Sequence, residues 1–300
     1  MNKILKKIID TGININIDIK KNYKRLRKLN NIAKKRANNN NIFDYTINAN
    51  NRDIPIRVFY PSGIPKQIII YYHGGGWVLG NNQTSSELCT KIATSTNSIV
   101  FAIEYALAPE FKFPQGFNDC YAITDIIIKD SMTFKIPKRR VYLMGDSAGG
   151  NIAACISLKR RDQKKYMPKK QILIYPVTAA IRTKEIYSSV GEFEYSQTLS
   201  LKQLEDYIDL YLNNYDDKNN PYFSPLKATT LKKQPKTLLI VANKDILRDE
   251  GIEYARALAD AKVKVQLVHI DEGHAYLTLF GESKGSKETI KIIKEFTKGR

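Results

Sequence analysis

The feature that most constrains the fold of this chain is the alternation of short apolar runs with helical patterns from residue 67 onward. Apolar runs of roughly four to eight residues fit buried strands, and apolar residues spaced three and four apart fit covering helices. The alternation predicts an α/β fold, with a mostly parallel central sheet flanked by helices on both faces. We expect strands at residues 42–48, 54–60, 67–72, 98–103, 141–145, 171–176, 237–242 and 263–269, and helices at 84–96, 116–130, 148–163, 200–213, 249–261 and 285–297.

Two stretches depart from this alternation. Residues 1–41 are rich in Lys and Asn and show helical spacing at their two ends, around Ile4 and around Leu29. Residues 178–225 place a polar loop and one helical pattern between two expected strands. Such an insertion usually lies above the carboxyl edge of the sheet, where α/β proteins bind ligands. We therefore expect an N-terminal basic helical segment at 1–41 and a core at 42–300 that carries the 178–225 insertion.

Length and composition favour a single large globular domain. The 300 residues are 43% hydrophobic and 26% charged, close to globular averages. The three cysteines, Cys89, Cys120 and Cys155, are widely spaced and form neither a disulfide framework nor a CxxC metal site, which suits a reducing compartment. No apolar run approaches the roughly 18 residues of a membrane span, and no secretory leader is visible. We expect a soluble, intracellular and therefore cytoplasmic protein with no transmembrane segment.

The net charge of +18 is concentrated at the N-terminus. Residues 1–41 hold nine Lys and three Arg against two Asp, which is +10 of the total. A basic segment of this kind can attract a membrane surface or another polyanion. The alternative is an A- and T-rich genome, which also favours Lys, Asn, Ile and Tyr codons. Aromatic residues near the segment are limited to Tyr23 and Phe43, so we expect no nucleic-acid partner.

A candidate nucleophile follows the apolar run at residues 141–144. Gly145-Asp146-Ser147-Ala148-Gly149 stands between that expected strand and the next expected helix. A sharp strand-to-helix turn at G-x-S-x-G presents a serine hydroxyl at the top of the sheet. Asp146 lies beside this serine, and we expect it to brace the turn. A second match, Gly281-Glu282-Ser283-Lys284-Gly285, follows no strand and is interpreted as a loop into the last helix.

A glycine-rich turn ends the strand at residues 67–72. His73-Gly74-Gly75-Gly76-Trp77 contains three consecutive glycines, whose backbone N–H groups can approach a ligand because no Cβ blocks them. Ester hydrolysis requires such donors to stabilise a tetrahedral oxyanion. We expect His73 and Gly74 to support this turn.

The chain contains only three histidines, so a general base for Ser147 can be sought by elimination. His73 belongs to the glycine turn, and His269 lies within an expected strand. His274 follows that strand at its carboxyl end and is the expected base. Asp245 follows the expected strand at 237–242 and is the expected carboxylate partner. Asp249 and Glu250 fit the N-terminal turn of a helix, where acidic residues are favourable.

These motifs resemble those of the hormone-sensitive-lipase-like esterases, also called the GDXG lipolytic family of α/β-hydrolases. The resemblance covers residues 66–280 and rests on the glycine turn, the segment Gly145-Asp146-Ser147-Ala148-Gly149-Gly150-Asn151, and two further segments. Tyr105-Ala106-Leu107-Ala108-Pro109-Glu110 is similar to the family's YRLAPE with alanine for arginine. Asp245-Ile246-Leu247-Arg248-Asp249-Glu250-Gly251 is similar to D-P-L-x-D-E-G with isoleucine for proline.

The resemblance implies an α/β-hydrolase fold with a helical cap built from the N-terminal helices and the 178–225 insertion. It also implies a serine carboxylesterase, with Ser147, Asp245 and His274 as catalytic triad in the chain order of α/β-hydrolases. Gly75, Gly76 and Ala148 would donate to the oxyanion. No metal or organic cofactor is implied, and the partner is a small-molecule ester with a short- to medium-chain acyl group. An amidase or deacetylase using the same triad, and a non-catalytic binding protein on this scaffold, stay open.

Overall fold

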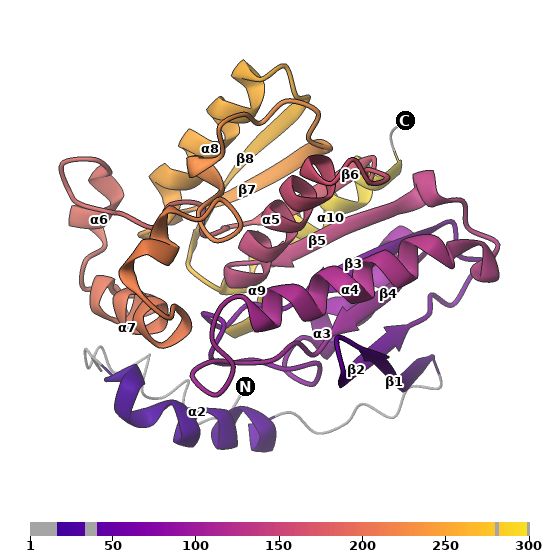
Figure 1. Ribbon diagram of the computed structural model, residues 1–300, viewed down its shortest axis with the longest axis horizontal. Helices are drawn as coiled ribbons and strands as arrows, with labels where there is room; N and C mark the ends of the chain where they lie inside the picture. The colour runs from indigo at the N-terminus through magenta and orange to yellow at the C-terminus, as the bar shows by residue number, and fades with distance from the viewer. Residues whose placement is uncertain (1–16, 34–40, 280–281, 299–300) are drawn as a thin grey trace.

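The structure is a computed structural model that describes residues 17–33, 41–279 and 282–298. In these residues, eight strands form one sheet in the order β1-β2-β4-β3-β5-β6-β7-β8 (Figure 1). β1 and β2 form an antiparallel hairpin, β2 is antiparallel to β4, and the remaining pairs are parallel. The strands are β1 (Ile42–Ala49), β2 (Arg52–Phe59), β3 (Gln67–Tyr72), β4 (Ser98–Ile103), β5 (Val141–Asp146), β6 (Lys170–Ile174), β7 (Lys236–Lys244) and β8 (Val265–Gly273).

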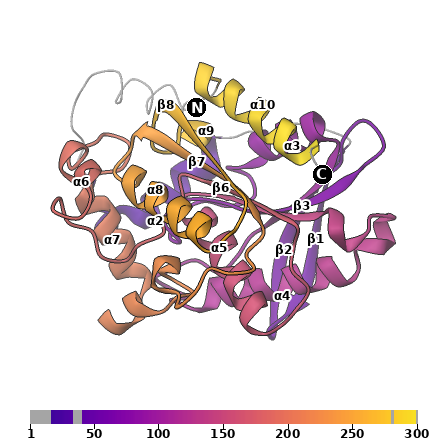
Figure 2. The same ribbon diagram turned by 90° about the horizontal axis from the view of Figure 1, so that it is seen from above.

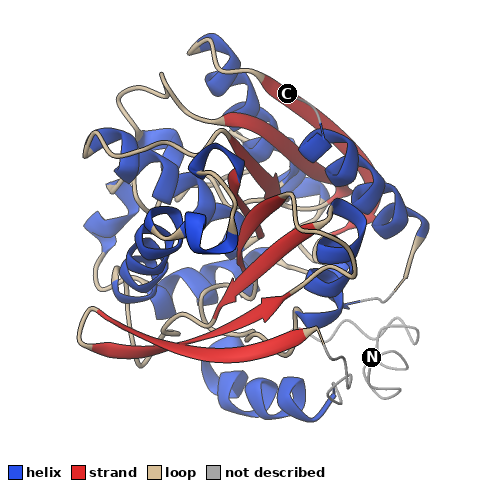
Figure 3. Ribbon diagram, turned by 90° about the vertical axis from the view of Figure 1, so that its right-hand side faces the viewer, coloured by secondary structure: helices blue, strands red, loops and turns tan. Residues whose placement is uncertain are grey.

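Helices cover both faces of the sheet. α3 (Ser86–Thr96) and α10 (Lys284–Lys298) lie side by side on one face, and α4 (Gln115–Lys129), α5 (Ala148–Asp162) and α8 (Arg248–Asp260) cover the other (Figure 2). Figure 3 shows the strands as a twisted layer between the helices. Side chains of a strand alternate between these two environments. In β3, Tyr72 packs toward α4 and α5, whereas Ile69 and Tyr71 pack toward α3.

The predicted α/β fold with a mostly parallel sheet is confirmed. All eight predicted strands and all six predicted helices are present, with ends displaced by a few residues. α2 (Ile19–Ala33) includes the helical spacing around Leu29, while the spacing around Ile4 lies outside the described residues. The short helices α6 (Ser188–Glu192) and α9 (Tyr276–Leu279) were not predicted, because four or five residues give too little periodicity. The described residues also form four 3₁₀ turns: η1 (Ser131–Phe134), η2 (Lys138–Arg140), η3 (Tyr215–Asn219) and η4 (Pro225–Lys227).

The 178–225 insertion carries α6 and α7 (Leu201–Tyr211). The side chain of Ser200 accepts a hydrogen bond from the N–H of Gln203, and this capping box starts α7. α2 packs along α7, as Figure 1 shows, and Lys20 Nζ lies 2.8 Å from Asp209 Oδ2. The ring of Tyr211 stacks on Trp77 at 4.7 Å between centroids, so α7 is attached to the glycine turn.

Within the described part of the chain, none of the helices combines the length and the apolar character needed to cross a membrane. Some of the basic charge of α2 is paired inside the molecule. Lys20 pairs with Asp209, and Arg27 Nη1 lies 3.0 Å from both carboxylate oxygens of Glu110.

Candidate active site

The turn from β5 into α5 places Ser147 in a strained backbone conformation. Its φ and ψ angles are 54° and −120°, a region that side-chain-bearing residues rarely adopt. The flanking glycines leave space for this turn. A Cβ on Gly145 would lie 2.2 Å from the carbonyl oxygen of Gly149, and a Cβ on Gly149 would lie 1.9 Å from that of Tyr72. Glycine is therefore required at both positions for steric reasons.

Ser147 meets His274 and Asp245 at the carboxyl edge of the sheet, after β5, β8 and β7 respectively. Ser147 Oγ lies 2.9 Å from His274 Nε2, and His274 Nδ1 lies 2.7 Å from Asp245 Oδ2. All three side chains are buried. The ring of Tyr175 contacts the His274 imidazole edge-on at 4.9 Å between centroids. Residues widely separated in the sequence thus form one continuous hydrogen-bonded chain.

The other acidic residues of this region have a different role. Asp245 Oδ1 accepts the N–H of Leu247 at 3.0 Å, which fixes the carboxylate toward His274. Glu250 is buried, and its Oε1 accepts the N–H groups of Thr178 and Ala179. Asp249 Oδ2 accepts the N–H of Ser189. Asp249 and Glu250 lie in the first turn of α8, as expected, but their carboxylates bond to the 178–225 insertion and do not cap that helix.

The glycine turn lines the same cavity as Ser147. Gly75 and Gly76 have φ angles of +115° and +60°, which favour glycine. The N–H groups of Val78 and Leu79 both donate to the carbonyl of Gly75, at 3.1 and 2.7 Å, and so fix the turn. Across residues 41–279, the N–H groups of Gly75, Gly76 and Ala148 donate to no protein acceptor. A Cβ on Gly76 would lie 2.4 Å from the ring of Tyr207, so α7 closes over the turn.

Asp146 connects the serine turn to the glycine turn. Its Oδ1 accepts the N–H of Gly74 at 3.0 Å and the hydroxyl of Tyr71. Burial raises the pKa of Asp146, while the bonds from Tyr71 and Gly74 oppose that rise. Burial, followed by the neighbouring Asp146, also raises the pKa of Tyr71 well above its usual value. The sequence predicted that Asp146 supports the turn. It did not predict the contact with Tyr71, whose hydroxyl bonds to Asp146 from the neighbouring strand β3.

The hydroxyl of Ser147 lies against His274, whereas His73 and His269 have other contacts. Burial lowers the pKa of His73 to about 4, so its imidazole is neutral near pH 7. Its Nδ1 lies 2.8 Å from the carbonyl oxygen of Gly74, and its ring stacks on Tyr105 at 4.2 Å. His269 is exposed on edge strand β8, with Nδ1 3.2 Å from Asn243 Oδ1. Neither histidine takes the place that His274 occupies.

The second G-x-S-x-G segment differs in structure from the first. Ser283 Oγ accepts the N–H of Ser286 at 3.0 Å at the start of α10, and Gly281 lies outside the described residues. Its hydroxyl therefore serves as a local turn contact. Within the described ranges, no group of three or more His, Cys, Asp or Glu side chains could hold a metal ion.

A cavity of about 190 Å³ opens in front of Ser147. The glycine turn and His274 line it, and most of its lining is apolar. The insertion contributes Leu199, Leu204 and Tyr207 to this lining, and the core contributes Trp77 and Val177. The arrangement presents a nucleophile, a base and free backbone donors to a small, largely apolar ligand.

Comparisons with known proteins agree with this geometry. A family described as alpha/beta hydrolase fold matches residues 69–278. A carboxylic ester hydrolase of Mycobacterium tuberculosis, LipN, is 35% identical over 257 residues, covering 81% of this chain and 67% of the relative. An arylesterase of Saccharolobus solfataricus is 28% identical over 253 residues, covering 83% and 80%. The solved structure of a hyperthermophilic esterase from the archaeon Pyrobaculum calidifontis superposes with a TM-score of 0.87, at 26% identity over 99% of this chain and 97% of that one.

Proposed function

The chain belongs to the alpha/beta hydrolase fold family, in its hormone-sensitive-lipase-like branch, and we propose that it hydrolyses carboxylic esters through an acyl-enzyme formed on Ser147. It is a serine hydrolase of the carboxylic-ester type, in agreement with its esterase relatives. The observation that carries the proposed mechanism is the hydrogen-bonded chain from Ser147 Oγ through His274 to Asp245. These hydrogen bonds favour turnover over binding alone, because each of the three residues has the partner that acyl transfer requires.

In the first stage, Ser147 Oγ attacks the ester carbonyl carbon while His274 Nε2 accepts its proton. The 2.9 Å contact between these atoms supports this transfer. The imidazolium that forms keeps its Nδ1–H directed at Asp245 Oδ2, whose negative charge stabilises it. When the carbon–oxygen bond breaks, His274 Nε2 returns the proton to the departing alcohol oxygen. Water then repeats the sequence on the acyl-enzyme and releases the acid.

The negative charge of each tetrahedral intermediate requires donors already in position. We assign this role to the backbone N–H groups of Gly75, Gly76 and Ala148, on the support of their lack of protein acceptors within residues 41–279. Ala148 begins α5, so the positive end of that helix also favours an oxyanion there. Asp146 holds the two turns together through the N–H of Gly74.

The acyl half of the substrate is short to medium in length. The cavity of about 190 Å³ supports this, because Leu199, Leu204 and Tyr207, from α7 and the loop before it, take up part of its lining. Tyr207 lies against Gly76, so the space in front of the glycine turn is narrow.

The test is hydrolysis of p-nitrophenyl acetate and butyrate by the wild type and two variants. We expect Ser147→Ala and His274→Ala each to lower kcat by at least about 10³-fold, because each removes a member of one catalytic unit. Ser283→Ala is the matched control, since it removes the serine of the other G-x-S-x-G segment. Unchanged turnover in Ser147→Ala would refute the mechanism, as would a loss in Ser283→Ala without unfolding.

A further inference from the structure

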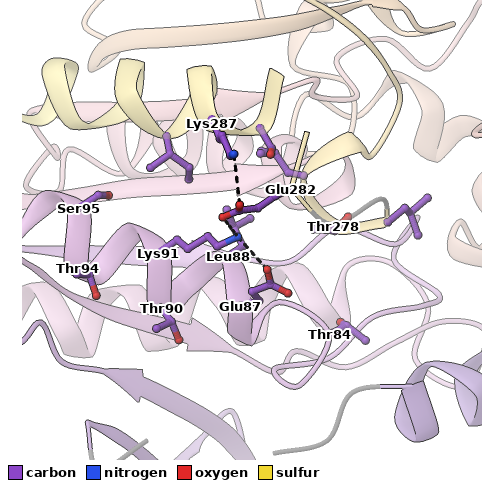
Figure 4. Close-up of a pocket in the computed structure, with 14 residues that line it drawn as sticks. Thr84, Glu87, Leu88, Thr90, Lys91, Thr94, Ser95, Thr278, Glu282 and Lys287 are labelled. Atoms are coloured by element: carbon purple, nitrogen blue, oxygen red, sulfur yellow. Dashed lines mark hydrogen bonds and ion pairs between the residues drawn. The ribbon is translucent and has the colours of Figure 1, made fainter. Parts of the chain in front are cut away.

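A second hollow, larger than the cavity at Ser147, lies between α3 and α10. It has a volume of about 460 Å³, and we call it the α3–α10 groove (Figure 4). Its floor is apolar: Leu88 is buried, and Leu277 and Ile290 pack in the same cluster. Thr90, Thr94 and Ser95 of α3 line it farther along. An apolar floor of this size fits a hydrocarbon chain.

The groove adjoins the catalytic cavity. Thr84, Thr278 and Leu279 line both spaces, so the groove starts where the cavity ends. Thr278 and Leu279 belong to α9, which begins two residues after His274. The groove therefore opens on the His274 side of the site. In Figure 4, Thr84 and Thr278 lie at one end of the groove, and Thr94 and Ser95 at the other.

The charged residues of the groove neutralise one another. Lys91 Nζ lies 2.9 Å from Glu87 Oε1 and 3.0 Å from Glu282 Oε1, and Lys287 Nζ lies 3.6 Å from Glu282 Oε2 (Figure 4). The pKa of Lys91 is raised by these two carboxylates in spite of desolvation, and that of Glu282 is lowered, mainly by Lys91. Two cations thus face two anions. This arrangement favours an uncharged ligand over a phosphate or a free carboxylate.

We propose that the α3–α10 groove binds the hydrocarbon chain of the alcohol half of the ester, while the short acyl half occupies the cavity at Ser147. The inference rests on the proposed function. When the ester carbon–oxygen bond breaks, the proton on His274 Nε2 moves to the departing alcohol oxygen, so this oxygen must lie beside His274. The groove begins on that side, along α9. The substrate class is a short-chain acid ester of a long apolar alcohol.

The test compares two series of esters on the intact protein. Ethyl, butyl, hexyl and octyl acetate vary the alcohol half, and p-nitrophenyl acetate, butyrate and octanoate vary the acyl half. In the wild type, each added CH₂ of the alcohol should raise kcat/KM by up to about fourfold, as expected for burial of a methylene. Thr90→Trp places a ring in the groove from a half-buried position of α3, between the catalytic end of the groove and Thr94, and should lower the octyl-to-ethyl ratio of kcat/KM at least about tenfold. In the same variant, the ratios of kcat/KM among the three p-nitrophenyl esters should equal those of the wild type.

Glu288→Trp, on the exposed side of α10 and outside the groove, is the matched control and should keep the wild-type ratio. Thr90→Phe provides a smaller obstruction at the same position should Thr90→Trp fail to fold. An unchanged octyl-to-ethyl ratio of kcat/KM in a folded groove variant would overturn the proposal. A groove variant in which only the kcat/KM ratios of the acyl series change would overturn it as well. A wild type that hydrolyses no ester of either series would instead refute the proposed function.

Discussion

The residue Ser147 combines the chemistry of the proposed mechanism with the backbone strain of its turn. A residue in such a sparsely populated region costs of order 1–3 kcal/mol and persists only when its surroundings enforce it. The surroundings here are Gly145 and Gly149, which lie too close to backbone oxygens to carry a Cβ, and Asp146, which accepts the N–H of Gly74. The strain is thus maintained by residues of β5, of the first turn of α5 and of the glycine turn after β3.

His73 allows a test of burial at the residue scale. Its pKa of about 4 lies below the usual 6.5. As the pH falls, the His73 imidazole therefore takes up a proton in the unfolded chain before it does so in the folded protein. The part of the unfolding free energy that depends on neutral His73 is therefore fully present above pH 6.5 and is lost as the pH falls toward 4. Between pH 7.5 and pH 5, the wild type should lose about 2 kcal/mol more unfolding free energy than His73→Gln.

Urea denaturation at the two pH values measures this difference. His269→Gln, at an exposed histidine, is the matched control and should follow the wild-type pH dependence. If His73→Gln and the wild type lost the same free energy over this range, His73 would not be buried in its neutral form.

At the scale of elements, α2 is attached to the glycine turn by Arg27. Arg27 Nε donates to the carbonyl of Val78 at 2.7 Å and Nη2 to that of Ala108 at 2.5 Å. Arg27→Ala should lower the unfolding free energy by about 2 kcal/mol, as for lost hydrogen bonds from a charged group. It should also lower kcat/KM severalfold, because Val78 shares its turn with Gly75 and Gly76.

Urea denaturation and ester hydrolysis check both effects. Arg25→Ala is the matched control, since Arg25 is exposed on the same helix and carries the same charge. Equal behaviour of the two variants would mean that α2 does not support the turn.

The 178–225 insertion is attached to α8 by a buried ion pair between Arg182 and Glu250. Both side chains are at most 3% exposed, and Arg182 Nη2 lies 3.0 Å from Glu250 Oε1. Arg182→Met should lower the unfolding free energy by about 3–5 kcal/mol, because it leaves a buried carboxylate without its cation. The double variant Arg182→Met with Glu250→Gln should recover part of that loss.

Thermal and urea denaturation of the single and double variants measure this coupling. Lys244→Met, which breaks the exposed Lys244–Asp271 pair, should cost less than about 1 kcal/mol. A double variant no more stable than Arg182→Met would contradict the assignment of the loss to an unpaired charge.

At the scale of the whole molecule, the parts predictable from sequence are those with a local signature. The strands and long helices follow from periodicity, and the positions of Ser147, Asp245 and His274 follow from their places after expected strands. The contacts of Tyr71 with Asp146, of Tyr207 with Gly76 and of Glu250 with the insertion had no such signature. They depend on which side chains meet after strands and helices pack, and one sequence does not carry that information.

The central claim, an activated Ser147 in an assembled triad, is tested most directly by labelling the purified protein with a fluorophosphonate. The modified residue is located by peptide mass spectrometry. The reagent needs a nucleophilic serine but no knowledge of the natural ester. We predict labelling of Ser147 in the wild type and its loss in His274→Ala, with Ser283 unlabelled in both. A folded protein that takes up no label, or takes it up at another serine, would contradict the account.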